Sequence, residues 1–270
     1  MKLGGRVGWF AAAVAVCACT ARAGDDIGVR TVEPTPIVAN AVAAQSEPAA
    51  PLGQMDPPPM GPLFPDDASI DWSANRTMKV LGRIAERATQ TEYWRGGARV
   101  DERRGSYAFD CSGMVEWVLQ KAAPAARSYS AQGLGHRPLA IDFQRRIASV
   151  PPDEERRGWR RISRIEDAQP GDVIAWIKPA IISSPNTGHV GFLVFKPARV
   201  PGRDDAYLVR IADSTSLLHE DDTRVGRKGF GLGTIVVLTD PATGSPRGYG
   251  WVGLRAWTFE TAIAIGRPLR

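Results

Sequence analysis

Cysteine is scarce in this chain, whose 270 residues include only Cys17, Cys19 and Cys111. The first two lie near the N-terminus, in a segment that a signal peptidase is expected to remove, so the mature chain would keep Cys111 alone and have no internal disulfide. A lone thiol in an oxidising compartment is a liability unless it has a chemical role. The scarcity of cysteine therefore directs attention to Cys111, for which a small buried hydrophobe is the alternative interpretation.

The chain also has no hydrophobic run of membrane-spanning length. Its apolar stretch from Val7 to Val16 follows basic residues and precedes small residues that end in Ala21-Arg22-Ala23. A spanning helix needs about 20 apolar residues, whereas this arrangement is typical of a secretory signal with an A-x-A cleavage site. We predict a signal peptide at residues 1–23. In the alternative, Val16-Cys17-Ala18-Cys19 acts as a lipoprotein box, and a lipid on Cys19 anchors the protein to a membrane.

The charge balance gives little reason to expect a nucleic-acid partner. The formal net charge is +5, but residues 1–23 contain three basic and no acidic residues, so their removal leaves +2. A charge of that size does not create the strong positive field that attracts a polyanion. No internal repeat, heptad pattern or phosphate-binding glycine loop is evident. We therefore expect neither nucleic acid nor a cofactor.

Residues 24–68 are rich in proline and alanine, with nine prolines between Pro34 and Pro65. No helical or strand period is sustained there, which is typical of a disordered leader or tether. We expect residues 69–270 to form one folded domain.

Helical signals dominate the first half of that domain. Ser73 precedes an apolar stripe of helical period and predicts a helix that runs to about Thr91. The stripe expected to face the core consists of Met78, Leu81, Ile84, Ala85 and Ala88. A second helix is predicted over about 111–122. Residues 124–164 then read as a basic, loop-rich insertion with a short helix around Leu139 to Ile147.

The second half reads as strands separated by glycine and proline. We predict five: Asp172–Trp176, His189–Phe195, Ala206–Asp213, Thr234–Thr239 and Tyr249–Trp257. Helices followed by strands with short connections indicate an α+β fold with antiparallel pairing. The glycines at 229, 231 and 233 predict a turn that enters the strand at Thr234.

The surroundings of Cys111 suggest a nucleophile. Asp110 directly before it is a residue type that caps helices, and the positive end of a helix favours a thiolate over a thiol. His189 offers a base, because it opens an apolar run expected to be a strand. A cysteine at a helix start and a histidine on a facing strand form the papain-like arrangement for nucleophilic catalysis.

Four blocks of sequence occur in a characteristic order: Tyr93-Trp94-Arg95-Gly96-Gly97, Phe109-Asp110-Cys111-Ser112-Gly113, Gln169-Pro170-Gly171-Asp172-Val173-Ile174 and Gly188-His189-Val190-Gly191-Phe192. Together they resemble the NlpC-type cell-wall cysteine peptidases, and the resemblance covers about Tyr93 to Thr239. It implies a papain-like α+β domain in which N-terminal helices carrying the cysteine pack on an antiparallel sheet of about five strands. By the same resemblance, Cys111 is the nucleophile and His189 the base.

The resemblance also implies a substrate and a location. Members of the family hydrolyse amide bonds in peptidoglycan stem peptides, commonly next to a D-amino acid. We accordingly expect peptidoglycan or a muropeptide as the substrate of a monomer exported to the periplasm or cell envelope. If Cys19 is lipidated, the protein would be an outer-membrane lipoprotein.

The residue that orients the histidine departs from the commonest family pattern, which has histidine or asparagine on the next strand. Asp213 is the best match, because it lies at the end of that strand and a carboxylate can hold a histidine tautomer. The alternative is that Asp213 only ends the strand in a turn. His219, in the following loop, is the second candidate for this role or for a substrate contact.

Further candidates for substrate binding come from the resemblance. It implies that Tyr93 lies beside the cysteine and donates its hydroxyl into the cleft, and a buried aromatic is the alternative. Asp110 or Ser112 would meet the free amine of a stem peptide. Arg137 would line the cleft, with a solvated loop residue as the alternative. No metal site is predicted, because the acidic residues after His219 lack the spacing of a calcium loop.

The sequence therefore predicts an exported cysteine amidohydrolase that forms an acyl-enzyme on Cys111. One alternative is a thiol amidase or acyltransferase that acts on a non-peptidoglycan amide. Another is a catalytically silent envelope binding module, which would be favoured if the insertion at 124–164 sealed Cys111 from solvent.

Overall fold

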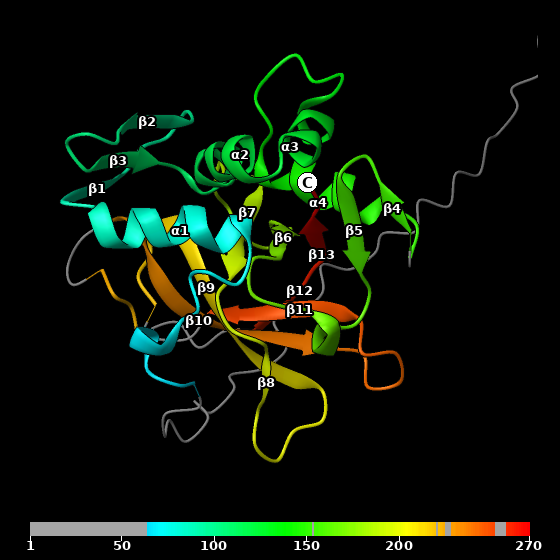
Figure 1. The fold of residues 1–270 in the computed structure, drawn as a ribbon. Coiled ribbons are helices and arrows are strands. Elements are labelled where there is room, and N and C mark those ends of the chain that lie inside the picture. The colour runs from blue at the N-terminus through cyan, green and yellow to red at the C-terminus, as the bar shows by residue number, and fades with distance from the viewer. Residues whose placement is uncertain (1–63, 153, 220, 225–227, 252–257) are drawn as a thin grey trace, which may run out of the picture. The chain divides into compact units, whose positions relative to one another are not determined.

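The computed structural model describes residues 64–152, 154–219, 221–224, 228–251 and 258–270 (Figure 1). All of them belong to one compact unit of the chain. The predicted signal peptide and the predicted leader up to residue 63 lie outside the described residues. The last residues of the predicted leader contact the folded domain. Phe64 stacks on Phe195 with ring centroids 5.9 Å apart, and Asp67 forms an ion pair with Arg210.

The described residues confirm a mixed α+β fold. Their helices are α1 (Arg76–Arg87), α2 (Cys111–Ala122), α3 (Pro124–Ala131), α4 (Ala140–Ala148) and the short 3-10 helices η1 (Asp67–Ser69) and η2 (Ile165–Asp167). Their strands are β1 (Gln90–Tyr93), β2 (Ala98–Asp101), β3 (Ser106–Phe109), β4 (Glu155–Arg156), β5 (Trp159–Ile162), β6 (Val173–Ile177), β7 (Gly188–Leu193), β8 (Ala198–Arg199), β9 (Ala206–Thr215), β10 (Gly229–Thr239), β11 (Pro246–Trp251), β12 (Thr258–Glu260) and β13 (Ile263–Pro268).

The first helix is shorter than predicted at both ends. Asn75 rather than Ser73 caps it, by accepting a hydrogen bond from the amide of Met78 at 3.0 Å. The Ser73 hydroxyl instead donates to Asp71 at 2.6 Å. At the other end, Ala88 is extended and the chain turns into β1, so Thr91 is in a strand. The predicted stripe is buried at its first three positions, but Ala85 is exposed.

The segment 124–164 is not loop-rich. It contains α3, α4, β4 and β5, and the predicted short helix corresponds to α4. Its apolar side chains Phe143, Ile147 and Trp159 are fully buried in the main core. The basic residues of α4 occupy its more exposed face. The basic composition of the segment therefore does not indicate that its apolar side chains belong to the core.

Nine strands follow one another across the main sheet in the order β12-β11-β10-β9-β7-β6-β13-β5-β4, and β8 pairs with β9. The neighbouring strands of this sheet are antiparallel. The five predicted strands correspond to its contiguous centre, β6, β7, β9, β10 and β11, although residues 252–257 of the last lie outside the described residues. A separate sheet has the order β1-β3-β2.

Strand alternation divides the apolar residues of β6 between two cores. Val173 and Ala175 of β6 face the helical layer, whereas Ile174 and Trp176 face a second cluster enclosed by other strands. In Figure 1 the helices α2, α3 and α4 lie together on one side, with β11 and β12 on the other. Burial on both faces explains why these strands read as continuous apolar runs. None of the described helices is long and apolar enough to cross a membrane.

The three glycines predicted to form a turn are part of a strand instead. Gly229, Gly231 and Gly233 all belong to β10, which pairs with β9 along its whole length. Their spacing of two places them on one face of the strand, where the absence of side chains leaves room for neighbouring residues.

Candidate active site

Cys111 is the first residue of α2, as predicted. Asp110 caps the helix, because its carboxylate accepts a hydrogen bond from the amide of Gly113 at 2.7 Å. The same carboxylate accepts from the amide of Gly96 at 3.1 Å and forms an ion pair with Arg137. The Ser112 hydroxyl also donates to it at 3.2 Å. Asp110 therefore has four partners and is buried, and it fixes the helix end that presents the cysteine.

The Tyr93–Gly97 and Phe109–Gly113 blocks form one structural unit. The amide of Asp110 donates to the carbonyl oxygen of Gly97 at 3.2 Å, and a Cβ atom at Gly113 would lie 2.1 Å from that oxygen. Gly96 and Gly97 have φ values of 109° and 124°, which favour glycine. The glycines of both motifs thus allow the backbone to cross closely over the N-terminus of α2.

The Gln169–Ile174 block is a structural turn at the start of β6. Asp172 is fully buried, pairs with Arg267 at 2.8 Å and accepts from the amide of Gln169 at 2.8 Å. The backbones of Gly171 and Asp172 both bond to Leu193 at the end of β7. This block therefore secures β6 against β7, the strand that carries His189.

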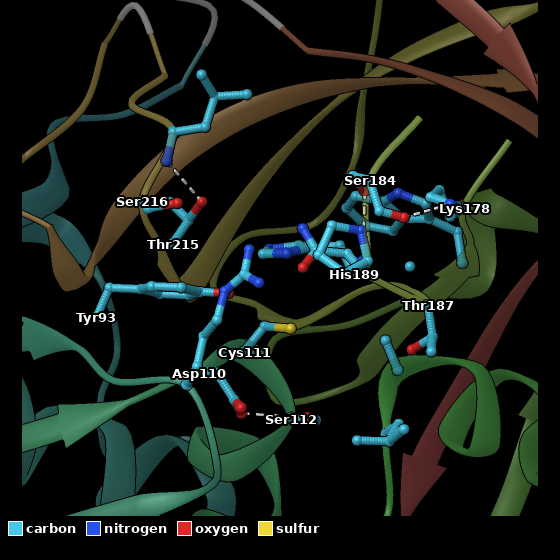
Figure 2. A pocket seen from close by; sticks show the side chains of 18 of the residues that line it. Tyr93, Asp110, Cys111, Ser112, Lys178, Ser184, Thr187, His189, Thr215 and Ser216 are labelled. Carbon is cyan, nitrogen blue, oxygen red and sulfur yellow. Dashed lines mark hydrogen bonds between the residues drawn. The ribbon is translucent and has the colours of Figure 1, made fainter. Parts of the chain in front are cut away.

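His189 lies on β7 beside Cys111, with its side chain 14% exposed (Figure 2). Its Nε2 atom is 2.7 Å from Oδ2 of Asp213. Burial of the ring opposes protonation, but the charge of a neighbouring Cys111 thiolate and hydrogen bonds to Asp213 and Cys111 outweigh it. Together they raise the pKa of His189 from 6.5 to about 10. The His189 imidazole is therefore protonated at neutral pH.

Asp213 lies on β9 and its side chain is fully buried. Its Oδ1 atom pairs with Arg224, while Oδ2 faces His189. Burial alone would raise the pKa of this carboxyl, but the charge of Arg224 and the hydrogen bonds from His189 and His219 hold it well below 3.8. Asp213 is thus ionised and contacts Nε2 of the imidazole, as expected of an orienting residue.

His219 does not line the cavity that contains Cys111. Its fully buried ring lies behind Asp213, with Nε2 3.5 Å from Oδ2 of that carboxylate and Nδ1 3.0 Å from the carbonyl oxygen of Thr234. It stacks on Trp251 with ring centroids 4.0 Å apart. The expectation that His219 contacts substrate is therefore wrong, since its side chain is an internal contact of Asp213.

Cys111 and His189 line one cavity of about 330 Å³. Tyr93, Asp110, Ser112 and Arg137, the other predicted binding residues, line it as well. Arg137 donates to the Ser112 hydroxyl at 2.8 Å. Burial, with the negative charges of Cys111 and Asp110 nearby, raises the pKa of Tyr93 above 10.0, so the phenol keeps its proton and can donate it.

The opposite wall was not predicted from the sequence. It consists of Trp176, Tyr249 and Trp251, together with residues of the segment between β6 and β7 that include Lys178, Ile182 and Asn186. Trp176 and Trp251 also contact the His189 ring, at centroid distances of 5.1 and 5.5 Å. Trp176 is also a member of the second core cluster and only 2% exposed, so its place in β6 gave no indication that it borders the cavity as well.

The described residues contain no cluster of three or more histidine, cysteine or acidic side chains with the geometry of a metal site. Comparison of the chain with protein-family models, curated proteins and solved structures finds no match.

Proposed function

We propose that this protein is a cysteine amidohydrolase with a papain-like arrangement of its active site. The observation that supports the proposal most strongly is that three separate elements bring together Cys111 and His189, which line one cavity, and Asp213, which contacts His189 at 2.7 Å. Cysteine at a helix start, histidine on a strand and a carboxylate on the adjacent strand correspond to nucleophile, base and orienting residue.

In the proposed reaction, the Cys111 thiolate attacks the carbonyl carbon of an amide. The negative charge that develops on the carbonyl oxygen is stabilised by backbone amides at the N-terminus of α2, because the first amides of a helix have no partner within it. The C–N bond then breaks, and His189 gives its proton to the leaving amine. His189 next takes a proton from water, which attacks the thioester to release the acid and regenerate Cys111.

Access to the thiol supports an enzyme over a silent binding module. Cys111 is only 9% exposed but lines the cavity, and the segment 124–164 contributes Arg137, Leu139 and Ala140 to the lining. The position of Cys111 at the cavity supports an enzyme rather than a module in which this segment seals the cysteine.

The proposed substrate class is the stem peptide of peptidoglycan. Support comes from the four sequence blocks that resemble NlpC-type peptidases and from the signal-like N-terminus, which would export the protein to the periplasm or cell envelope. The cavity combines a charged wall around Asp110 and Arg137 with an aromatic wall around Trp176, which suits a short peptide carrying both charged and apolar groups.

Mass spectrometry of muropeptides incubated with the mature protein tests the proposal. We expect one amide bond to be cut, and we expect no cut with Cys111→Ala. Products in which an added amine replaces water would identify an acyltransferase. Intact muropeptides after prolonged incubation, together with cleavage of other amides, would contradict the proposed substrate class.

A further inference from the structure

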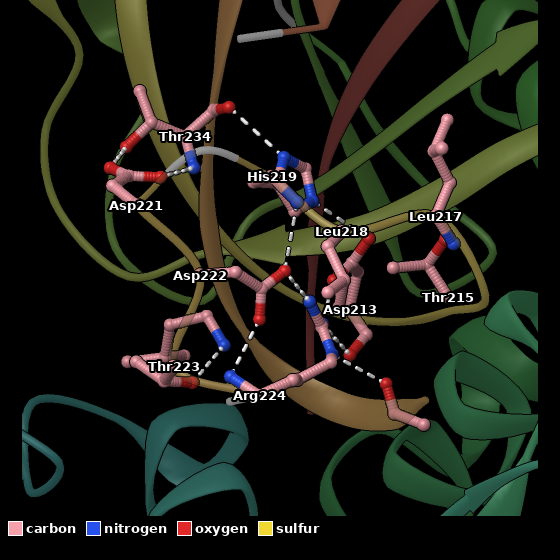
Figure 3. A network of polar contacts seen from close by, with 12 residues as sticks. Asp213, Thr215, Leu217, Leu218, His219, Asp221, Asp222, Thr223, Arg224 and Thr234 are labelled. Atoms are coloured by element: carbon pink, nitrogen blue, oxygen red, sulfur yellow. Dashed lines mark hydrogen bonds and ion pairs between the residues drawn. The ribbon is translucent and has the colours of Figure 1, made fainter. Parts of the chain in front are cut away.

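Arg224 pairs with Oδ1 of Asp213, whereas His189 contacts Oδ2. Figure 3 shows Arg224 between Asp213 and Asp222. Its Nη2 atom donates to Oδ1 of Asp213 and, at 2.8 Å, to the backbone oxygen of the same residue. Its Nε atom donates to the carbonyl oxygen of Gly229 at 2.6 Å, and Nη1 pairs with Asp222 at 2.5 Å. The side chain is 1% exposed, so the whole guanidinium is used in buried contacts.

The face of β10 is shaped to hold this side chain. A Cβ atom at Gly231 would lie 2.4 Å from Cγ of Arg224, and one at Gly233 would lie 2.1 Å from Cδ2 of His219. Two alternate glycines thus leave space for the arginine and the histidine that approach Asp213 from behind. Any larger residue at these positions would displace one of them.

We propose that Arg224 is a positioning residue that holds the Asp213 carboxylate in the orientation that fixes His189. The geometry assigns this role because the two carboxylate oxygens have different partners: Oδ1 is taken by Arg224 and Oδ2 faces Nε2 of His189. A carboxylate held at one oxygen cannot rotate the other away from the imidazole. His189 is then kept with its remaining nitrogen toward Cys111.

The guanidinium also compensates the charge of Asp213. An ionised carboxylate in a fully buried position is strongly disfavoured unless a cation or hydrogen bonds stabilise it. The charged or titratable groups in contact with Asp213 in the described residues are His189 from β7, His219 and Arg224 from the segment after β9. Of these, Arg224 alone is a permanent cation. Asp222 pairs with Arg224 and accepts from the amide of His219 at 3.0 Å.

The catalytic role of Arg224 rests on the proposed function, but the effect of Arg224 on Asp213 and His189 can be measured without substrate. The chain has only three histidines, so imidazole nitrogen spectra of the full chain resolve His189 after assignment with single His→Gln variants. The test compares these spectra across pH for wild type, Arg224→Met and Arg224→Lys, together with kcat and KM on the cleaved substrate.

A matched control is Arg210→Met. Arg210 is also a buried arginine of this region, but it pairs with Asp67 and Asp221 and does not contact Asp213. Loss of either arginine removes buried ion pairs, so both variants are expected to lower the melting temperature. Only loss of Arg224 is expected to change His189.

In Arg224→Met the Asp213 carboxyl loses its permanent cation, so we expect its pKa to rise and its protonation to add a new step on the acid side of the His189 titration. The same variant should lose at least about tenfold in kcat with little change in KM, and the acid limb of its pH profile should move up by at least about one unit. Arg210→Met should show the wild-type titration and pH profile.

Two results would overturn the inference. One is a folded Arg224→Met protein with the wild-type His189 titration and wild-type kcat. If Arg224→Met does not fold, the other is wild-type kcat in Arg224→Lys, since a single ammonium cannot replace the fork that joins Asp213, Asp222 and Gly229. If wild type cleaves no amide, the proposed function fails, and the His189 titration alone still decides whether Arg224 holds Asp213.

Discussion

Two aspartate–arginine pairs flank the Cys111–His189 pair, and they differ in burial. In the Asp110–Arg137 pair the side chains are 8% and 26% exposed and both line the cavity. In the Asp213–Arg224 pair they are 0% and 1% exposed, and neither lines it. Under the proposed function, the same chemical pairing would serve two purposes: the cavity pair would hold the start of α2 and meet substrate, and the buried pair would orient His189.

The largest effect is expected from the two residues between these pairs. Cys111→Ala and His189→Ala should each lower turnover by at least about 10⁴-fold, and the double variant should be hardly worse, because nucleophile and base act as a unit. Turnover of a muropeptide by the two single variants and the double variant measures this. Near-normal turnover in either single variant would contradict the assigned roles.

The next largest effect separates the two carboxylates. Asp213→Asn should lower kcat by about 10³- to 10⁴-fold, because the amide no longer stabilises the protonated imidazole or its tautomer. Asp110→Asn should retain α2, since asparagine is an equally good cap, and should mainly raise KM. Asp205→Asn, at an ion pair with Arg203 outside the cavity, is the control. Equal losses of kcat at both positions would remove the distinction between the pairs.

A smaller effect is expected on the cavity side. Arg137→Ala should raise KM on the order of tenfold, equivalent to about 1.4 kcal/mol of binding free energy, with little change in kcat. Arg127→Ala is matched to it, because Arg127 pairs with Glu116 at 2.6 Å and does not line the cavity. A fall in kcat with unchanged KM would instead place Arg137 in the orientation of the cysteine.

The smallest effect is a pH dependence of stability. The folded-state pKa of His189 is raised from 6.5 to about 10, so its contribution is fully present below pH 6.5 and is lost as the pH rises toward 10. Asp213 has a depressed pKa and contributes above about 3.8, with loss at lower pH. The difference in melting temperature between wild type and His189→Gln should shrink from pH 6.5 to 10, and a difference that stays constant over this range would contradict the raised pKa of His189.

The cavity side of the site could be predicted from the sequence because its signals are local. Asp110 and Cys111 are adjacent in the chain, and a capping residue before an apolar helical pattern places the cysteine at the helix start. His189 opens an apolar run that is indeed a strand, β7. Tyr93, Asp110, Ser112 and Arg137, chosen by resemblance, all line the cavity.

The buried side could not be predicted, because it depends on contacts between distant segments. Arg224 follows several acidic residues in a stretch that reads as a solvated loop, and nothing local indicates its burial. Its position depends on Gly231 of β10, which was interpreted as part of a turn. The burial of His219 could not be predicted either. Its loop position in the sequence does not reveal that Gly233 of β10 leaves space for the imidazole ring.

The central claim is that Cys111 forms an acyl-enzyme that water resolves. Its most direct test is cleavage of a muropeptide in ¹⁸O-labelled water, with rapid acid quenching and peptide-resolved mass spectrometry of the protein. The account predicts an acyl adduct on the Cys111 peptide at early times and one ¹⁸O atom in the newly formed carboxylate, both absent in Cys111→Ala. Cleavage that persists in Cys111→Ala, with no adduct on the wild-type peptide, would contradict it.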